Sequence, residues 1–118
     1  MRLAQRERMG DGMSWLVVTK WDRRDAASRE DFGACALRLC QAAKGRGAVT
    51  SSRFYWSNPD QVAVVNHTDD LSVYWSTPGE ALGAALFAMA DVATMAGQEQ
   101  WADARQGTAT YREAGREV

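Results

Sequence analysis

The one histidine of the sequence, His67, is the side chain best suited to proton transfer near neutral pH. Asp69 follows two positions later, and side chains two apart on an extended strand point to the same face. A carboxylate there could orient or charge the imidazole, which is the minimum arrangement for general acid–base catalysis. The pattern predicts His67 and Asp69 as catalytic residues. The alternative is a solvated histidine at a strand end, beside an aspartate that caps a helix or forms a turn.

Large aromatic side chains are the second feature with chemical meaning, because the sequence has five tryptophans. Trp56 and Phe54 are expected on the strand face that carries His67. Aromatic walls of this kind suit a pocket for a flat aromatic or polycyclic ligand. The alternative is that these rings fill the core and a subunit interface. The residues predicted to bind substrate are Trp21, Phe54, Trp56, Tyr74 and Trp75.

Other polar and sulfur-bearing residues form weaker patterns. Arg53 and Asn66 are expected to oppose each other across a hairpin, where they either hold a ligand oxygen or form an ordinary cross-strand pair. Cys35 and Cys40 lie about 140° apart around a predicted helix, so they cannot form a disulfide with each other. Neither a recognised metal-ligand spacing nor a phosphate-binding glycine loop is present. The sequence therefore predicts no metal site and no cofactor.

The first half of the chain predicts a strand followed by an amphipathic helix. Residues 14–21 are rich in β-branched and aromatic side chains, which favour a strand. Ser28 is a helix N-cap signal, and Asp31 stands in the capping-box position behind it. One apolar stripe then repeats with helical spacing. It consists of Phe32, Cys35, Ala36, Leu39, Cys40 and Ala43.

The middle of the chain predicts a β-hairpin of residues 48–57 and 61–68 that turns at Asn58-Pro59-Asp60. A turn centred on these residues sets the register of the two strands. The expected pairs are Ser57 with Val62, Tyr55 with Val64 and Arg53 with Asn66. The same register places on the opposite face Ser52, Phe54, Trp56, Ala63, Val65 and His67.

The second half predicts a further helix and a last strand. A helix begins at Thr77-Pro78 and runs to about Ala96, and it is apolar on several sides. A short helical turn is expected over 98–105 and a strand over 107–113. The order is strand, helix, strand, strand, helix, strand. This order predicts an α+β, ferredoxin-like fold in which a four-stranded antiparallel sheet carries two helices on one face.

Length and composition limit the classes of function. With 118 residues, the chain fits a single domain over 13–118, preceded by a flexible leader over 1–12. A net charge of -1 without blocks of like charge argues against nucleic acid or a membrane surface as partner. The two unpaired cysteines and the lack of a signal peptide favour a cytoplasmic location.

The element order, the long connection before an apolar second helix and the short last strand resemble those of the dimeric α/β-barrel superfamily. Its members include antibiotic-biosynthesis monooxygenases, small polyketide cyclases and haem-degrading monooxygenases. The resemblance implies a homodimer in which the helix-free faces of two sheets meet and close a barrel. Haem breakdown is disfavoured, because the first strand lacks the asparagine, and the second helix the histidine, of the haem-degrading members.

The resemblance and the aromatic residues together predict a cofactor-independent enzyme that acts on a hydrophobic, aromatic or polyketide-like molecule. Cyclisation, isomerisation and oxygenation all stay open as reactions. In this hypothesis His67 moves a proton, Asp69 orients it, and the aromatic rings hold and desolvate the substrate. The alternative is a non-catalytic dimeric protein, either a ligand carrier or an accessory subunit.

Overall fold

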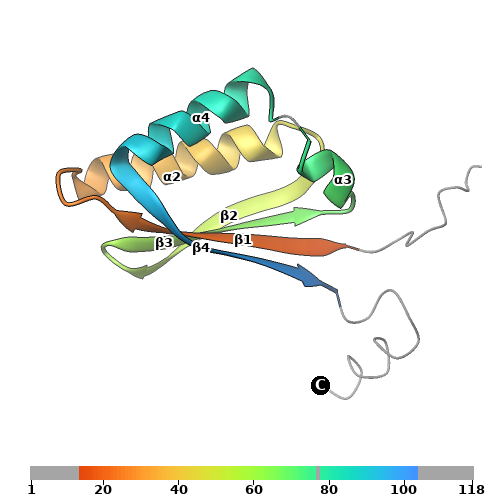
Figure 1. Cartoon of the computed structure of the whole chain (residues 1–118), viewed down its shortest axis with the longest axis horizontal. Helices are drawn as coiled ribbons and strands as arrows, with labels where there is room; N and C mark the ends of the chain where they lie inside the picture. The colour runs from red at the N-terminus through yellow and green to blue at the C-terminus, as the bar shows by residue number, and fades with distance from the viewer. Residues whose placement is uncertain (1–13, 77, 104–118) are drawn as a thin grey trace, which may run out of the picture.

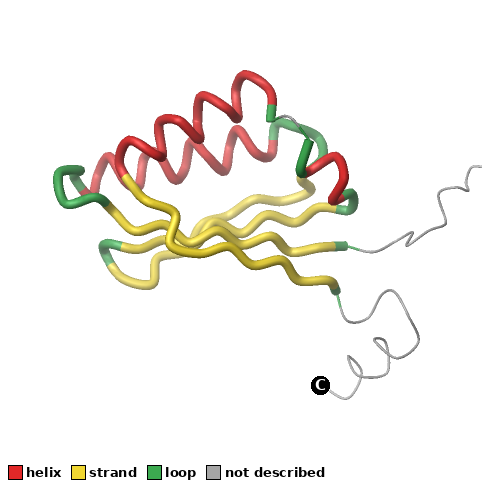
Figure 2. The backbone as a smooth tube through the Cα atoms, viewed as in Figure 1, coloured by secondary structure: helices red, strands yellow, loops and turns green. Residues whose placement is uncertain are grey.

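The computed structural model describes residues 14–76 and 78–103, which form one four-stranded sheet and three helices (Figure 1). The strand order is β2-β3-β1-β4, and every neighbouring pair is antiparallel. Helices α2 and α4 form a second layer on one face of the sheet, and α3 lies at one end (Figure 2). The predicted ferredoxin-like fold is confirmed. The elements are β1 (Trp15–Arg23), α2 (Arg29–Lys44), β2 (Val49–Asn58), β3 (Gln61–Thr68), α3 (Leu71–Tyr74), α4 (Gly79–Val92) and β4 (Ala93–Ala102).

Helix α2 forms as its sequence predicts. The Ser28 side chain caps it by accepting a hydrogen bond from the backbone N–H of Asp31. Its apolar stripe faces the sheet, because burying this face removes the most apolar surface from water. After α2 the chain turns at Gly47, whose φ of 83° is a backbone angle that glycine adopts without strain. The buried core residues of this helix are Phe32, Ala36, Leu39, Cys40 and Ala43.

The predicted hairpin register is wrong by one residue over most of its length, and a β-bulge is the reason. At the turn Asn58 pairs with Gln61, as a turn at this position requires, but the register shifts between Trp56 and Asn58. Beyond this bulge Trp56 pairs with Val62 and Phe54 with Val64. A shift of one residue moves every side chain of a strand to the other face. Phe54 and Trp56 therefore lie on the helix-covered face.

The second half of the chain also differs from the prediction. Helix α4 ends at Val92, and β4 begins at the next residue, so the predicted helix end and the helical turn near Trp101 are wrong. The backbone N–H and C=O groups along one edge of β1 require hydrogen-bond partners, and β4 supplies them. Tertiary pairing of this kind overrides the helix propensity of an alanine-rich segment. The predicted leader over 1–12 and the predicted strand over 107–113 lie outside the described residues.

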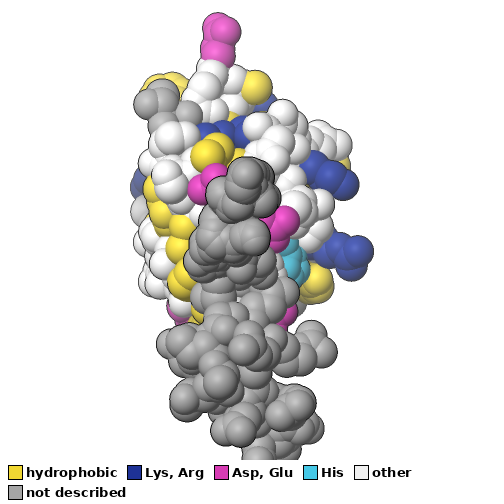
Figure 3. Space-filling view, turned by 90° about the vertical axis from the view of Figure 1, so that its right-hand side faces the viewer, with side chains coloured by type: hydrophobic (Ala, Val, Ile, Leu, Met, Phe, Trp, Pro, Cys, Tyr) yellow, Lys and Arg dark blue, Asp and Glu magenta, His cyan; other side chains and the backbone are white. Residues whose placement is uncertain are grey.

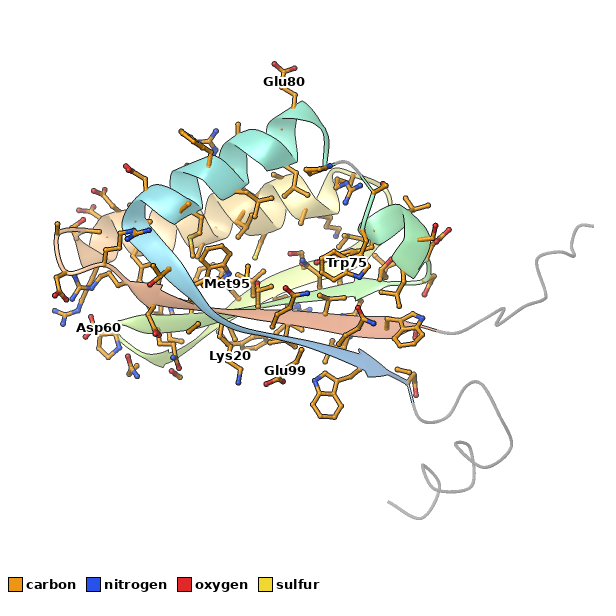
Figure 4. All side chains as sticks on the ribbon, viewed as in Figure 1. Lys20, Asp60, Trp75, Glu80, Met95 and Glu99 are labelled. Carbon is orange, nitrogen blue, oxygen red and sulfur yellow. The ribbon has the colours of Figure 1, made fainter. Side chains whose placement is uncertain are left out.

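One face of the sheet carries no helix, and we call it the helix-free face. Lys20 and Glu99 point away from the helices on this face and form a salt bridge of 2.8 Å (Figure 4). The Lys20 ammonium, through this hydrogen bond, lowers the pKa of the Glu99 carboxyl. Within the described part of the chain, no helix is long and apolar enough to cross a membrane.

Candidate functional site

A cavity of about 300 Å³ lies between the sheet and the helices. In Figure 4, Trp75 and Met95 lie between these two layers. The volume of the cavity is at the lower end of the range for small-molecule sites, which is about 300–1,000 Å³. The cavity is walled by apolar side chains with a few polar groups. The described residues that line it are Thr19, Trp21, Leu39, Ala43, Arg46, Val49, Val64, Asn66, Tyr74, Trp75, Ser76, Pro78, Leu82, Leu86, Met95 and Gln98.

Three of the predicted substrate-binding residues meet in this cavity: Trp21, Tyr74 and Trp75. Trp21 lies near the C-terminal end of β1, and its indole N–H donates to the Thr19 hydroxyl at 2.9 Å. Trp75 follows α3, and its indole N–H donates to the side-chain oxygen of Gln100 on β4 at 3.0 Å. Because both indole N–H groups already have acceptors, these rings offer a ligand apolar surface rather than hydrogen bonds.

A polar chain runs from β2 into the cavity through a buried asparagine. The Ser52 hydroxyl donates to Asn66 Oδ1 at 2.5 Å, and Asn66 Nδ2 donates to the Tyr74 hydroxyl oxygen at 2.9 Å. Asn66 is only 7% exposed, so both ends of its amide need partners inside the protein. As the Tyr74 oxygen accepts from Asn66, its own O–H proton is left for another acceptor.

The environment of Tyr74 keeps its phenol protonated. Burial raises the pKa of Tyr74, while smaller opposing effects come from the Asn66 hydrogen bond and the positive charge of Arg46. Near neutral pH the side chain is therefore a hydrogen-bond donor. An O–H donor in an apolar cavity favours a carbonyl, enolate or phenolate oxygen as its acceptor.

Arg46 is the one charged side chain among the described residues that line the cavity. It lies two residues after α2, and its guanidinium donates to the backbone oxygens of Tyr74 at 2.9 Å and Val73 at 3.1 Å and to the Ser76 hydroxyl at 3.1 Å. These bonds attach α3 to the end of α2 and hold a positive charge beside the cavity. A fixed positive charge favours a ligand that carries or develops negative charge.

The other two predicted substrate-binding residues do not line the cavity. Phe54 is partly buried and packs against the core. Trp56 packs edge-on against Phe32, with 5.6 Å between ring centroids, and borders a shallow surface hollow near the hairpin turn. The prediction that Phe54 and Trp56 share a face with His67 is wrong, because the bulge in β2 moves them to the opposite face.

The two predicted catalytic residues lie away from the cavity. His67 is exposed on the helix-free face (cyan in Figure 3), and its Nδ1 is 2.9 Å from the Ser51 hydroxyl oxygen. Asp69 is exposed in the turn after β3, and no hydrogen bond or ion pair among the described residues joins it to His67. The prediction that Arg53 opposes Asn66 is also wrong, since Arg53 pairs with Val65 on the face that carries His67.

The sequence pattern does not predict Arg46 as a site residue, and it predicts Asn66 only as the partner of Arg53. A polar residue at a buried strand position is a signal for Asn66, because it alternates with Val62 and Val64 on one face of β3. Arg46 gives no comparable signal, since it stands in a polar connection between two glycines. Within residues 14–76 and 78–103, no three side chains of the metal-binding types come together.

Solved structures share this fold. The cofactor-independent oxygenase SnoaB from Streptomyces nogalater aligns with a TM-score of 0.62 and 9% identity, over 75% of this chain and 90% of that chain. A putative antibiotic biosynthesis monooxygenase from Chloroflexus aurantiacus aligns with a TM-score of 0.59 and 12% identity, over 75% and 90%. A dimeric ferredoxin-like protein of unknown function from Thermobifida fusca aligns with a TM-score of 0.56 and 16% identity, over 77% and 90%.

Neither a family model nor a curated protein matches the sequence. Identities this low show a common fold and leave the activity open. These structures therefore confirm the predicted ferredoxin-like fold, whereas the predicted homodimer stays a prediction.

Proposed function

We propose that this protein is a cofactor-independent enzyme that binds a flat, hydrophobic aromatic or polyketide-like molecule in the cavity between sheet and helices. The observation that carries the proposal is the Tyr74 hydroxyl, which Asn66 holds by its oxygen in a mainly apolar, aromatic-walled cavity. A ligand with a carbonyl or phenol oxygen would fill the cavity with its rings and receive the Tyr74 proton as a hydrogen bond.

Oxygenation is the reaction we favour for this site. A methylene between aromatic rings, opposite a carbonyl, can ionise to a delocalised carbanion whose charge rests on the oxygen. The methylene would lose one proton to solvent, and Tyr74 and Arg46 would stabilise the negative charge on the oxygen. The carbanion would add O₂ to give a peroxide that takes up one proton, and loss of water from this hydroperoxide then leaves a carbonyl where the methylene was. The net reaction consumes one O₂ and releases one water for each methylene that becomes a carbonyl. The fold neighbours described as oxygenases support this choice.

Cavity-filling variants test whether the ligand binds here. Leu86 lines the cavity from α4, whereas its neighbour Phe87 is 82% exposed on the same helix. Leu86→Trp should abolish binding of a tricyclic aromatic ketone such as 9-fluorenone, measured by its fluorescence, and Phe87→Trp should leave binding unchanged. Equal binding by both variants would refute the cavity as the site.

Oxygen uptake separates an enzyme from a carrier. A hydroxylated tricyclic ketone with an acidic methylene is mixed with the protein in an oxygen-electrode cell. Uptake above the protein-free rate, lost in Leu86→Trp and kept in Phe87→Trp, supports the enzyme. Tight binding without any uptake or change of the compound would instead support the ligand-carrier alternative.

The proposed assembly is a homodimer through the helix-free face. Tyr55 and Trp101 are exposed on strands whose other face is already covered by helices, and an uncovered apolar sheet face favours a partner. The Thermobifida fusca neighbour is described as dimeric. Val65→Lys on this face should produce monomers in sedimentation at micromolar concentration, whereas Leu37→Lys on the outer surface of α2 should not. A monomeric wild-type protein would contradict the dimer.

A further inference from the structure

Ser52 contributes to the polar chain without lining the cavity. It stands opposite Asn66 in the β2–β3 ladder and donates its hydroxyl proton to Asn66 Oδ1. Ser52 is thus the side chain that holds the oxygen end of the Asn66 amide.

The direction of this chain decides what Tyr74 can do. The two ends of an asparagine amide have nearly the same shape, but one end donates and the other accepts. With Oδ1 toward Ser52, Nδ2 faces Tyr74 and the phenol keeps its proton for a ligand. With the amide reversed, Tyr74 would have to donate its only proton to Oδ1, and none would remain for the cavity.

We propose that Ser52 is a positioning residue that sets the orientation of the Asn66 amide and so keeps the Tyr74 proton directed at the ligand. The orientation of the amide is inferred only from the pairing of Ser52 with Asn66 and from the two hydrogen bonds of the Asn66 side chain. Only the identity of the final acceptor, a ligand oxygen, rests on the proposed function.

NMR of the Asn66 side-chain amide tests the orientation without any ligand. In wild-type protein, Tyr74→Phe should shift the Asn66 Nδ2 proton resonances strongly, because it removes their acceptor. In Ser52→Ala the amide is free to reverse, so the same Tyr74→Phe substitution should shift them little. Ser52→Thr, which keeps the hydroxyl, should behave like the wild type. Equal shifts in the wild-type and Ser52→Ala backgrounds would overturn the proposal.

A pair of matched probes tests the consequence for a ligand. Fluorene and 9-fluorenone have the same flat tricyclic shape, and only fluorenone has a carbonyl. Ser52→Ala should reduce the preference for the ketone by about two- to tenfold, the value of one hydrogen bond. It should also raise the carbonyl stretching frequency of bound fluorenone, while the affinity for fluorene stays the same. Ser52→Thr should restore the ketone preference and the frequency.

The outcomes separate the two proposals. If Ser52→Ala weakens both probes equally and leaves the carbonyl frequency unchanged, Ser52 has a structural role only and the proposal is overturned. If neither probe binds the wild-type protein, the proposed function fails for this class of ligand. The amide resonances then still decide whether Ser52 orients Asn66.

Discussion

Removing the Tyr74 hydroxyl should destabilise the protein although it deletes a single oxygen atom. In Tyr74→Phe, Asn66 Nδ2 loses the acceptor that lies 2.9 Å away, and at 7% exposure Asn66 has little access to water as a replacement. A buried donor left without a partner costs about 1–3 kcal/mol. The phenol itself is partly buried, and its loss returns some desolvation free energy. We therefore expect a free energy of unfolding about 1–2 kcal/mol lower than that of the wild type.

Urea unfolding at neutral pH, followed by tryptophan fluorescence, measures this loss. Phe87→Leu is the control, because Phe87 is 82% exposed on α4 and such surface changes stay within about 0.5 kcal/mol. In an Asn66→Leu background the donor is absent, so Tyr74→Phe should cost almost nothing there. The m-value should stay constant throughout. An equal cost in both backgrounds would refute the hydrogen bond on which the candidate site is built.

Three further outcomes follow from the structure. Met89→Ala, at a fully buried position of α4, should lower the free energy of unfolding in urea by about 2–5 kcal/mol, and a loss under 1 kcal/mol would contradict its place in the core. Hydrogen bonds from Arg29 and then Arg23 lower the pKa of Asp60, so its stabilising effect is present above the unfolded pKa and is lost as the pH falls through the folded one. Asp60→Asn should therefore flatten the acid side of a plot of thermal midpoint against pH, and an unchanged slope would count against the pairing. His67→Ala should leave fluorenone affinity unchanged, and if it abolished turnover of an identified substrate, the chemistry would belong on the helix-free face.

Local signals predicted much of the fold. The Ser28 cap and the apolar stripe of α2 are encoded within one helix and need no distant partner to be recognised. The last strand could not be found in the same way, since Ala93–Ala102 has no period-2 pattern of its own. Its conformation depends on pairing with the edge of β1, whose paired residues lie at least seventy positions earlier in the chain.

The candidate site was predicted in part. Trp21, Tyr74 and Trp75 line one cavity. Burial removes the apolar surface of Trp21 and part of that of Tyr74 from water, whereas Trp75 is 50% exposed. The predicted grouping of His67 with Trp56 failed through one extra residue in β2. A bulge has no strong sequence signature, and yet it reassigns every side chain between the two faces.

The polar groups of the cavity bear on how the proposed reaction would start. Tyr74 is held in its protonated form, and Arg46 carries a fixed positive charge; each stabilises negative charge on a ligand, and neither accepts a proton readily. The described lining contains no carboxylate and no imidazole. If the proposed function is right, the described lining supplies no base, so the substrate must be acidic enough to lose its proton without one. A ketone whose enol or phenol ionises near neutral pH fits such a cavity, and a weakly acidic isomer of the same shape should bind without being turned over.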